Sequence, residues 1–170
     1  MRANTASTEM SCPKPLRVRA QNIPQTLRVK DRWVLWQYQY REGKWTKVPQ
    51  QPNGRNASTT DANTWSPLVR VLQIYRAGGY DGIGFVVTEE DEIVGVDLDH
   101  CRDPKSGAME PWAHDIIDRL DSYTELSPSG TGIRIFVTAH FRSSSNRKGG
   151  VEIYAKGRYF TVTGQVLNNG

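Results

Sequence analysis

The chain has 170 residues, of which 37% are hydrophobic and 9% aromatic, including five Trp. This length matches one domain with a buried core, and the aromatic content argues against disorder over most of the chain. No apolar run approaches the roughly 20 residues that a membrane span requires, and the first twenty residues contain no apolar signal core. We therefore expect a cytoplasmic protein. Cys12 and Cys101 form no Cys-x-x-Cys motif, which argues against a disulfide framework or a zinc site built from Cys pairs.

The net charge of +4 is unevenly distributed along the chain. Residues 1–60 contain 11 Lys or Arg against 3 Asp or Glu, residues 61–130 contain 5 against 14, and residues 131–170 contain 6 against 1. An acidic middle between basic segments has two interpretations. It is either solvated surface or a carboxylate metal site whose basic walls attract polyanions.

The first half of the chain contains a predicted hairpin and a predicted helix. The polar stretch 1–22 is expected to be a flexible leader. Residues 33–40 and 45–49 are rich in aromatic and β-branched residues and flank a glycine turn, which predicts a β-hairpin. A helix is expected to start near Ser66 and to stop at Gly78, because Pro67 suits its first position and glycine its end.

The second half is predicted to contain mainly strands. Strands are expected at 83–87 and 93–99, then a helix over 111–120 whose apolar residues have helical spacing. Further strands are expected at 133–137, 151–154 and 158–163, with the Ser-rich, basic segment 142–150 as a flexible loop. This order predicts a mixed α+β domain with several antiparallel strand pairs and two helices.

Two aspartates end the strand predicted over 93–99. Because side chains alternate along a strand, Asp97 and Asp99 share one face, with Cα atoms about 7 Å apart. Two such carboxylates repel each other unless a cation neutralises them, so the pair is a natural platform for Mg²⁺ or Mn²⁺. The alternative is two surface acids at a strand end. A calcium loop starting at Asp97 is excluded, because Arg102 stands at its glycine position and Ala108 at its final Glu position.

A small-residue turn, SPSGTGIR, occupies residues 127–134. Gly130 and Gly132 would let backbone N–H groups approach an anion, and the hydroxyls of Ser129 and Thr131 can donate hydrogen bonds. Arg134, at the start of the next strand, can bind phosphate. The turn is therefore either a phosphate site or an ordinary hairpin connection.

The remaining candidate residues are less informative by themselves. Glu152 is the only acidic residue after Arg134, in a predicted strand among basic residues, and it can be an ion-pair partner of Lys148 or Arg158. The three histidines have no ligand or triad spacing, so a surface or core role is expected for each.

Taken together, these segments resemble the archaeo-eukaryotic primase superfamily, specifically the primase–polymerase domains at the N-terminus of phage and plasmid replication proteins. The resemblance runs from about residue 24 to residue 164. It rests on five segments in order: 33–49 (WVLWQYQYREGKWTKVP), 80–86 (YDGIGFV), 94–101 (VGVDLDHC), 122–136 (SYTELSPSGTGIRIF) and 150–164 (GVEIYAKGRYFTVTG).

The resemblance implies that residues 23–170 are the catalytic domain of a longer replication protein. Its fold would be an RRM-like antiparallel sheet joined to an N-terminal α/β unit, with the active-site cleft between them. By family motif, Asp97, Asp99 and Glu152 would be the catalytic acids and would bind two Mg²⁺ or Mn²⁺ ions.

The resemblance also implies the partners, which are template DNA, nucleoside triphosphates and a C-terminal or separate helicase. The nucleotide's phosphates would contact Ser129, Gly130, Thr131, Arg134 and Arg158. Arg134 departs from the family, which usually has a histidine there. Lys44, Lys47, Arg147 and Lys148 are candidates for DNA contacts because they are basic and lie in the flanking segments.

The rival interpretation is a non-catalytic single-strand or origin DNA-binding replication module. A pure binding module would not need the full acidic trio, which favours the enzyme. A rolling-circle nicking enzyme is disfavoured further, because the chain has no His-x-His pair.

Overall fold

The fold is built from two antiparallel sheets, seen here in a computed structural model that describes residues 11–141 and 145–167. One sheet has the strand order β2-β1-β3-β9, with β1 (Trp33–Arg41), β2 (Lys44–Gln50), β3 (Gly82–Val87) and β9 (Arg158–Val162). The other has the order β5-β6-β4-β8-β7, with β4 (Ile93–Leu98), β5 (Tyr123–Leu126), β6 (Ile133–Thr138), β7 (Ser145–Lys148) and β8 (Val151–Tyr154). The predicted mixed α+β class is confirmed.

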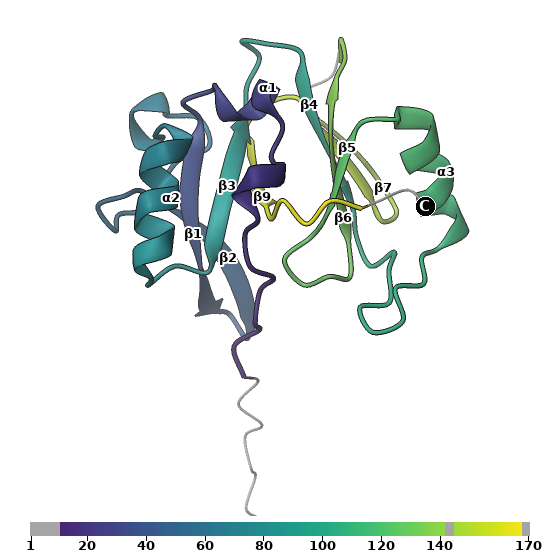
Figure 1. The fold of residues 1–170 in the computed structure, drawn as a ribbon, viewed down its shortest axis with the longest axis horizontal. Helices are drawn as coiled ribbons and strands as arrows, with labels where there is room; N and C mark the ends of the chain where they lie inside the picture. Colours follow the sequence, from purple (N-terminus) through teal and green to yellow (C-terminus); the bar gives the residue numbers. More distant parts are fainter. Residues whose placement is uncertain (1–10, 142–144, 168–170) are drawn as a thin grey trace, which may run out of the picture.

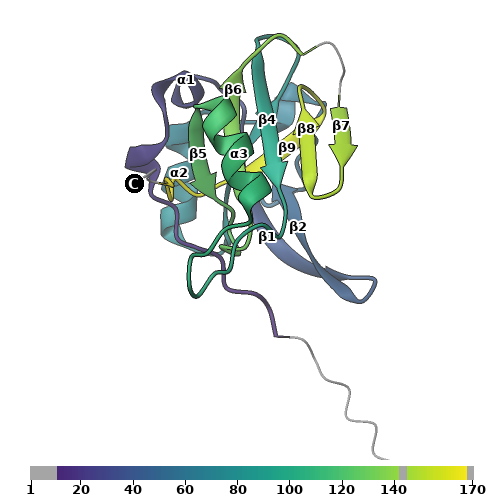
Figure 2. The ribbon, with the colours of Figure 1, turned by 90° about the vertical axis from the view of Figure 1, so that its right-hand side faces the viewer.

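Within the described residues, three α-helices and two short 3₁₀ turns accompany the sheets. The helices are α1 (Gln25–Arg28), α2 (Leu68–Ala77) and α3 (Pro111–Leu120), and the 3₁₀ turns are Ala20–Asn22 and Ala62–Thr64. From left to right, Figure 1 shows α2, the four-stranded sheet, the five-stranded sheet and α3. Figure 2 shows α3 lying across the outer face of the five-stranded sheet. In the described part of the chain, no helix is long and apolar enough to cross a membrane.

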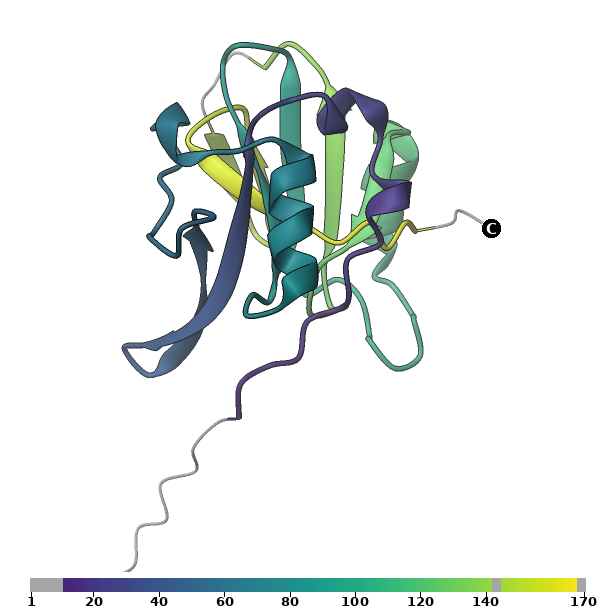
Figure 3. The same cartoon turned by 60° about the vertical axis from the view of Figure 1, so that its left-hand side comes forward.

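The predicted hairpin is confirmed as β1 and β2. Its two-residue connection is Glu42-Gly43, and both residues have positive φ, 49° and 80°. Two positive φ angles match the twist of paired strands, and glycine adopts the second without strain. Figure 3 shows the hairpin extending beyond the rest of the domain. Near its tip, Tyr40 and Trp45 pack edge to face with ring centroids 5.3 Å apart.

Two strands were not anticipated from the sequence. The segment 142–150 was expected to be a flexible loop, but Ser145–Lys148 form the edge strand β7 and pair with β8. All four β7 residues are exposed, so no apolar alternation marks the strand, and only its backbone pairing makes it one. Residues 142–144 of that expected loop lie outside the described residues. The short strand β5 is the other strand that the sequence patterns did not predict.

Part of the expected leader belongs to the folded domain. Leu16 N–H donates to the Pro128 carbonyl (2.8 Å) and Arg19 N–H to the Thr163 carbonyl (2.7 Å). The Asn22 side chain donates to the Gly164 carbonyl (2.9 Å). These bonds attach residues 16–22 to segments far away in the sequence, whereas residues 1–10 lie outside the described residues.

The two sheets meet through a row of aromatic side chains. Strand register aligns Tyr123, Phe136, Gly95 and Tyr154 across the five-stranded sheet. Phe160 of β9 packs against this row, with its ring centroid 5.6 Å from that of Phe136 and 6.2 Å from that of Tyr154. A Cβ at Gly95 would lie 2.2 Å from a Phe160 ring carbon, so glycine is what lets the sheets approach.

The opposite face of the five-stranded sheet packs on α3. Val96, Leu98, Ile133 and Ile135 are buried there in one cluster with Ala113 and Ile117 of the helix. The expected apolar face of the 93–99 strand is thereby confirmed for Val96 and Leu98. It follows that Gly95 and Asp97, on the other face of β4, point toward the four-stranded sheet.

Candidate active site

A row of charged residues crosses the whole five-stranded sheet, two residues along from the aromatic row. The register pairs Glu125 with Arg134, Arg134 with Asp97, Asp97 with Glu152, and Glu152 with Arg147. Because alternate residues on a strand share a face, this row also faces the four-stranded sheet. The row cannot be recognised from the sequence, because its members are spread over residues 97–152.

Asp97 and Arg134 form a buried ion pair at the centre of this row. The Arg134 guanidinium donates through Nη1 to Asp97 Oδ1, and the two side chains are only 8% and 9% exposed. Burial, together with nearby Arg158, lowers the pKa of Arg134 to about 10, so the side chain stays charged at neutral pH. Arg134 Nε is buried and has no hydrogen-bond partner among the described residues. A buried donor without a partner is costly, which makes this nitrogen a candidate for a ligand contact.

Glu152 is buried beside Asp97 and is also neutralised by the protein. Its Oε1 lies 3.0 Å from Arg147 Nε, and its Oε2 lies 3.6 Å from an Arg158 nitrogen. The Tyr154 hydroxyl donates to Oε2 at 2.8 Å. The expected pairing of Glu152 with Arg158 is therefore present, while Arg147 rather than Lys148 is the second partner.

Asp99 follows directly after β4 and is half-buried. Its N–H donates to the Gly150 carbonyl at 2.8 Å. A Cβ at Gly132 would lie 2.7 Å from the Leu98 carbonyl, and one at Gly150 would lie 3.0 Å from the Asp99 carbonyl. Two glycines therefore allow the neighbouring turns to close around the end of β4 and to hold Asp99 in place.

At the far end of the row, Glu125 has a structural role. Its carboxylate accepts hydrogen bonds from the N–H groups of Thr163 (2.8 Å) and Gly164 (2.7 Å) and from the Tyr123 hydroxyl (2.7 Å). Complete burial raises the pKa of Glu125 to about 7. This side chain attaches the segment after β9 to the five-stranded sheet.

A groove of about 900 Å³ opens between the two sheets, lined by residues of both. The side formed by the five-stranded sheet contributes Asp97, Asp99 and Arg134. On the other, β2 contributes Lys44 and Lys47. Arg158 lines it from the start of β9. The groove thus brings together four predicted nucleotide or metal residues, Asp97, Asp99, Arg134 and Arg158, whereas Glu152 is not among the described residues that line it.

The groove has a concentration of positive charge opposite the acids. Burial, together with the charges of Arg134 and Arg158, lowers the pKa of Lys47 to about 8, while Asp99 opposes the shift. The Tyr159 hydroxyl donates to the Lys47 carbonyl (2.7 Å) and so ties β2 to β9 at this point. Three cations that repel one another in a half-buried groove favour a bound polyanion.

Other predicted residues lie away from the groove. None of the described residues that line it comes from the turn Ser129-Gly130-Thr131. The turn's hydroxyls bond to one another, with Ser129 Oγ 2.8 Å from Thr131 Oγ1. Arg102 donates to the Gly130 carbonyl at 3.0 Å. Among the predicted DNA contacts, Lys44 and Lys47 line the groove, whereas Arg147 and Lys148 lie on the exposed strand β7.

The acids have the right chemistry to bind a divalent cation, but in this structure they form ion pairs with arginines. Asp97 and Glu152 are hard oxygen donors on neighbouring strands, which is what Mg²⁺ or Mn²⁺ requires. Within residues 11–141 and 145–167, however, no three His, Cys, Asp or Glu side chains are close enough together to hold a metal ion. The Asp97 carboxylate forms an ion pair with Arg134, and the Glu152 carboxylate forms ion pairs with Arg147 and Arg158. A cation would therefore have to take the place of arginine.

Comparison with known proteins shows that the chain is similar to a phage protein. The chain is 34% identical over 143 residues to a protein named DNA primase-polymerase from Nitratiruptor phage NrS-1. The match covers 80% of this chain but 19% of that protein, so the chain spans about a fifth of this relative's length. No protein-family model matches the chain.

Proposed function

Because this similarity and the ordered motifs make the chain a primase–polymerase domain of the phage type, we propose that it is a metal-dependent nucleotidyltransferase. It adds nucleotides to a 3′-hydroxyl on a DNA template during phage or plasmid replication. The observation that carries this proposal is the position of Asp97, which lies opposite Arg134 and Glu152 on the neighbouring strands and lines a groove with cationic walls. A replication module that only bound DNA would not need buried acids there.

The metal ligands of this proposal are Asp97, Asp99 and Glu152. They would hold two Mg²⁺ or Mn²⁺ ions, which when bound supply activation of the 3′-hydroxyl and stabilisation of the leaving pyrophosphate. The chain's own contribution is to hold Asp97 and Glu152 next to each other. Arginines allow this before any ion is bound, because they compensate two carboxylates that would otherwise repel each other.

The triphosphate would bind along the cationic wall formed by Lys47, Arg134 and Arg158. All three line the groove, and Arg134 has a donor nitrogen that no described residue uses. We therefore propose that Lys47 contacts the nucleotide rather than DNA. For Ser129, Gly130 and Thr131 we propose a contact with the outermost phosphate only, because the turn lies just before β6 and outside the groove lining.

The remaining roles concern DNA and the overall arrangement. Lys44, at the hairpin, and Arg147 and Lys148, on β7, are proposed to contact the template backbone. The five-stranded sheet with α3 would be the RRM-like unit, and the four-stranded sheet with α2 the N-terminal α/β unit. A C-terminal or separate helicase is proposed as a partner of the longer protein.

Extension of a labelled primer on a DNA template tests the proposal. The wild-type chain should incorporate nucleotides with Mg²⁺ or Mn²⁺, and Asp99→Asn should abolish incorporation. Asp99 is the best first target because it has no ion pair within the described residues, so its loss leaves no buried arginine unpaired. Asp115→Asn, an exposed acid on α3, is the matched control.

The rival function makes the opposite prediction in the same assay. A single-strand or origin DNA-binding module would bind DNA and incorporate nothing with either metal. Wild-type rates in an Asp99→Asn/Glu152→Gln variant would also end the polymerase proposal. Either result would leave the fold and the family similarity unchanged.

A further inference from the structure

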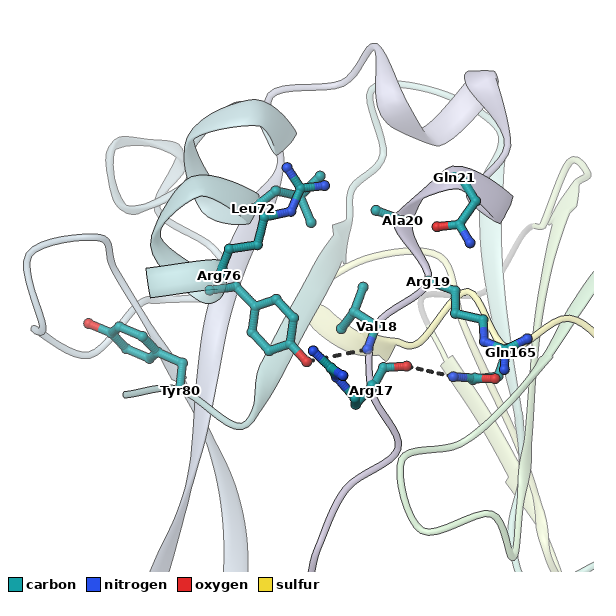
Figure 4. A pocket seen from close by; sticks show the side chains of 10 residues that line it. Arg17, Val18, Arg19, Ala20, Gln21, Leu72, Arg76, Tyr80 and Gln165 are labelled. Carbon is teal, nitrogen blue, oxygen red and sulfur yellow. Dashed lines mark hydrogen bonds between the residues drawn. The ribbon is translucent and has the colours of Figure 1, made fainter. Parts of the chain in front are cut away.

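Three arginines surround a second hollow, on a different part of the molecule from the groove. This arginine hollow has a volume of about 620 Å³ and shares no lining residue with the groove. Arg17 and Arg19 come from the N-terminal segment, and Arg76 comes from the last turn of α2 (Figure 4). Gln21 and Gln165 contribute amide groups to its lining.

The backbone that presents these arginines is held in place. Arg19 N–H donates to the Thr163 carbonyl at 2.7 Å. Val18 N–H donates to the Tyr75 hydroxyl at 3.3 Å, and the Gln165 side chain donates to the Arg17 carbonyl at 2.6 Å. Figure 4 shows the last two contacts as dashed lines beside the arginine side chains. The segment therefore presents Arg17 and Arg19 from a fixed backbone, opposite a helix.

The charge of the arginine hollow is uncompensated. It has no Asp or Glu in its lining, whereas the groove is lined by Asp97 and Asp99. None of Arg17, Arg19 and Arg76 forms an ion pair with another described residue, and all three are exposed. Such a site attracts anions from solution.

We propose that the arginine hollow binds the sugar–phosphate backbone of single-stranded DNA. Figure 4 shows the three guanidinium groups distributed around the hollow rather than directed at one point. A single phosphate could contact only part of this set, whereas a strand with a phosphate at every nucleotide can contact all of it. The proposal rests on the proposed function only in the choice of DNA as the polyanion.

Consequently the domain has two anion sites with separate tasks. The groove, with its acids, is suited to a nucleotide with metal ions. The arginine hollow has no acids and is suited to the backbone of the template strand away from the reacting nucleotide. Contacts to phosphate add affinity without reading sequence.

The test measures binding of a fluorescein-labelled oligo-dT to the full chain, by anisotropy over a range of salt concentrations, without metal or nucleotide. In the variant Arg17→Ala/Arg19→Ala/Arg76→Ala, affinity should fall by at least about tenfold, since several charge-assisted contacts are lost. The slope of log K against log salt should fall by about 2, because each phosphate contact on a single strand contributes roughly 0.7.

The matched control is Arg55→Ala/Arg70→Ala/Arg119→Ala. It removes the same charge from three exposed arginines that line neither the arginine hollow nor the groove. It should retain most of the affinity and slope. Replacement of Arg17, Arg19 and Arg76 by lysine should also retain most of the binding, because lysine still attracts phosphate. Circular dichroism and thermal unfolding check that each variant is folded.

Two outcomes would overturn the inference. An equal loss of affinity in the control variant would mean that only net charge matters. An equal dependence of duplex DNA on the same three arginines would exclude a single-strand site. A wild-type chain that incorporates no nucleotide would end the proposed function but leave this binding measurement unaffected, so the two failures are distinguishable.

Discussion

Asp97 and Arg134 lie directly opposite each other on β4 and β6 and form an ion pair that is almost completely buried. The family to which the motifs are similar usually has a histidine at the second of these positions. A histidine is shorter and titrates near neutral pH, whereas arginine is a permanent cation with several donors. In this chain, therefore, the Arg134 guanidinium and a metal ion would compete for the same Asp97 carboxylate.

The ion pair makes Asp97 important for stability as well as for activity. We expect Asp97→Ala to lower the free energy of unfolding by about 3–5 kcal/mol, because it leaves the Arg134 guanidinium buried without a counter-ion. The double variant Asp97→Ala/Arg134→Met should recover most of that loss. Urea unfolding measures both, with Asp115→Ala as the control. Equal stability of Asp97→Ala and wild type would contradict the buried pair.

Removal of Arg134 should strengthen metal binding while weakening nucleotide binding. Without its competitor, Asp97 should bind Mn²⁺ at least about tenfold more tightly in the absence of nucleotide, given the energies of close charge pairs. Electron paramagnetic resonance of free Mn²⁺ measures this in Arg134→Ala, with Arg119→Ala as the control. If Arg134 contacts only phosphate, Mn²⁺ affinity without nucleotide will not change.

The same substitution has a kinetic signature. Arg134→Ala should raise the KM for nucleotide roughly ten- to a hundredfold, the usual effect of a lost charge-assisted contact, and Arg134→His should recover part of it. Steady-state incorporation at saturating Mn²⁺ separates this effect from metal affinity. An unchanged KM and kcat would move the phosphate contact to Arg158 or Lys47.

Nucleotide binding should depend on the protonation of Lys47. Burial and the neighbouring arginines lower the pKa of this amine to about 8, so the free protein loses the charge as pH rises through that value. The Kd for nucleotide should therefore increase between pH 7.5 and 9.5, with full affinity below the pKa. Lys47→Arg should remove this pH dependence, because arginine stays protonated over the range. Isothermal titration at fixed ionic strength checks it, and a pH dependence that persists in Lys47→Arg would exclude Lys47 as its source.

Gly95 should be essential for the contact between the sheets. An alanine Cβ would lie 2.2 Å from the Phe160 ring, so Gly95→Ala forces the sheets apart or moves the ring. We expect a loss of about 1–3 kcal/mol in unfolding free energy, the usual range for overpacking. Phe160→Leu should partly rescue Gly95→Ala, although it destabilises the wild type. Additive effects of the two substitutions would show that the residues are not in contact.

Features that depend only on residues close together in the sequence could be predicted from the sequence. Alternation along a single strand was enough to place Val96 and Leu98 together on one apolar face of β4, the face that packs on α3. The hairpin was readable from Gly43 between two aromatic runs, and α3 was predicted with its observed bounds because its apolar spacing is strongly helical. Each of these features arises from backbone geometry over a few residues, so each leaves a local pattern.

The tertiary structure alone decided which charges meet. Nothing local to Arg134 shows that it lies opposite Asp97 instead of pointing freely at a phosphate, and nothing local to Lys47 places it in the groove. Both outcomes depend on strand order and register, which are set by the packing of the aromatic row against Phe160 and by long-range backbone pairing. For the same reason β7 could not be predicted. Its residues are polar and exposed, and only β8 beside it makes them a strand.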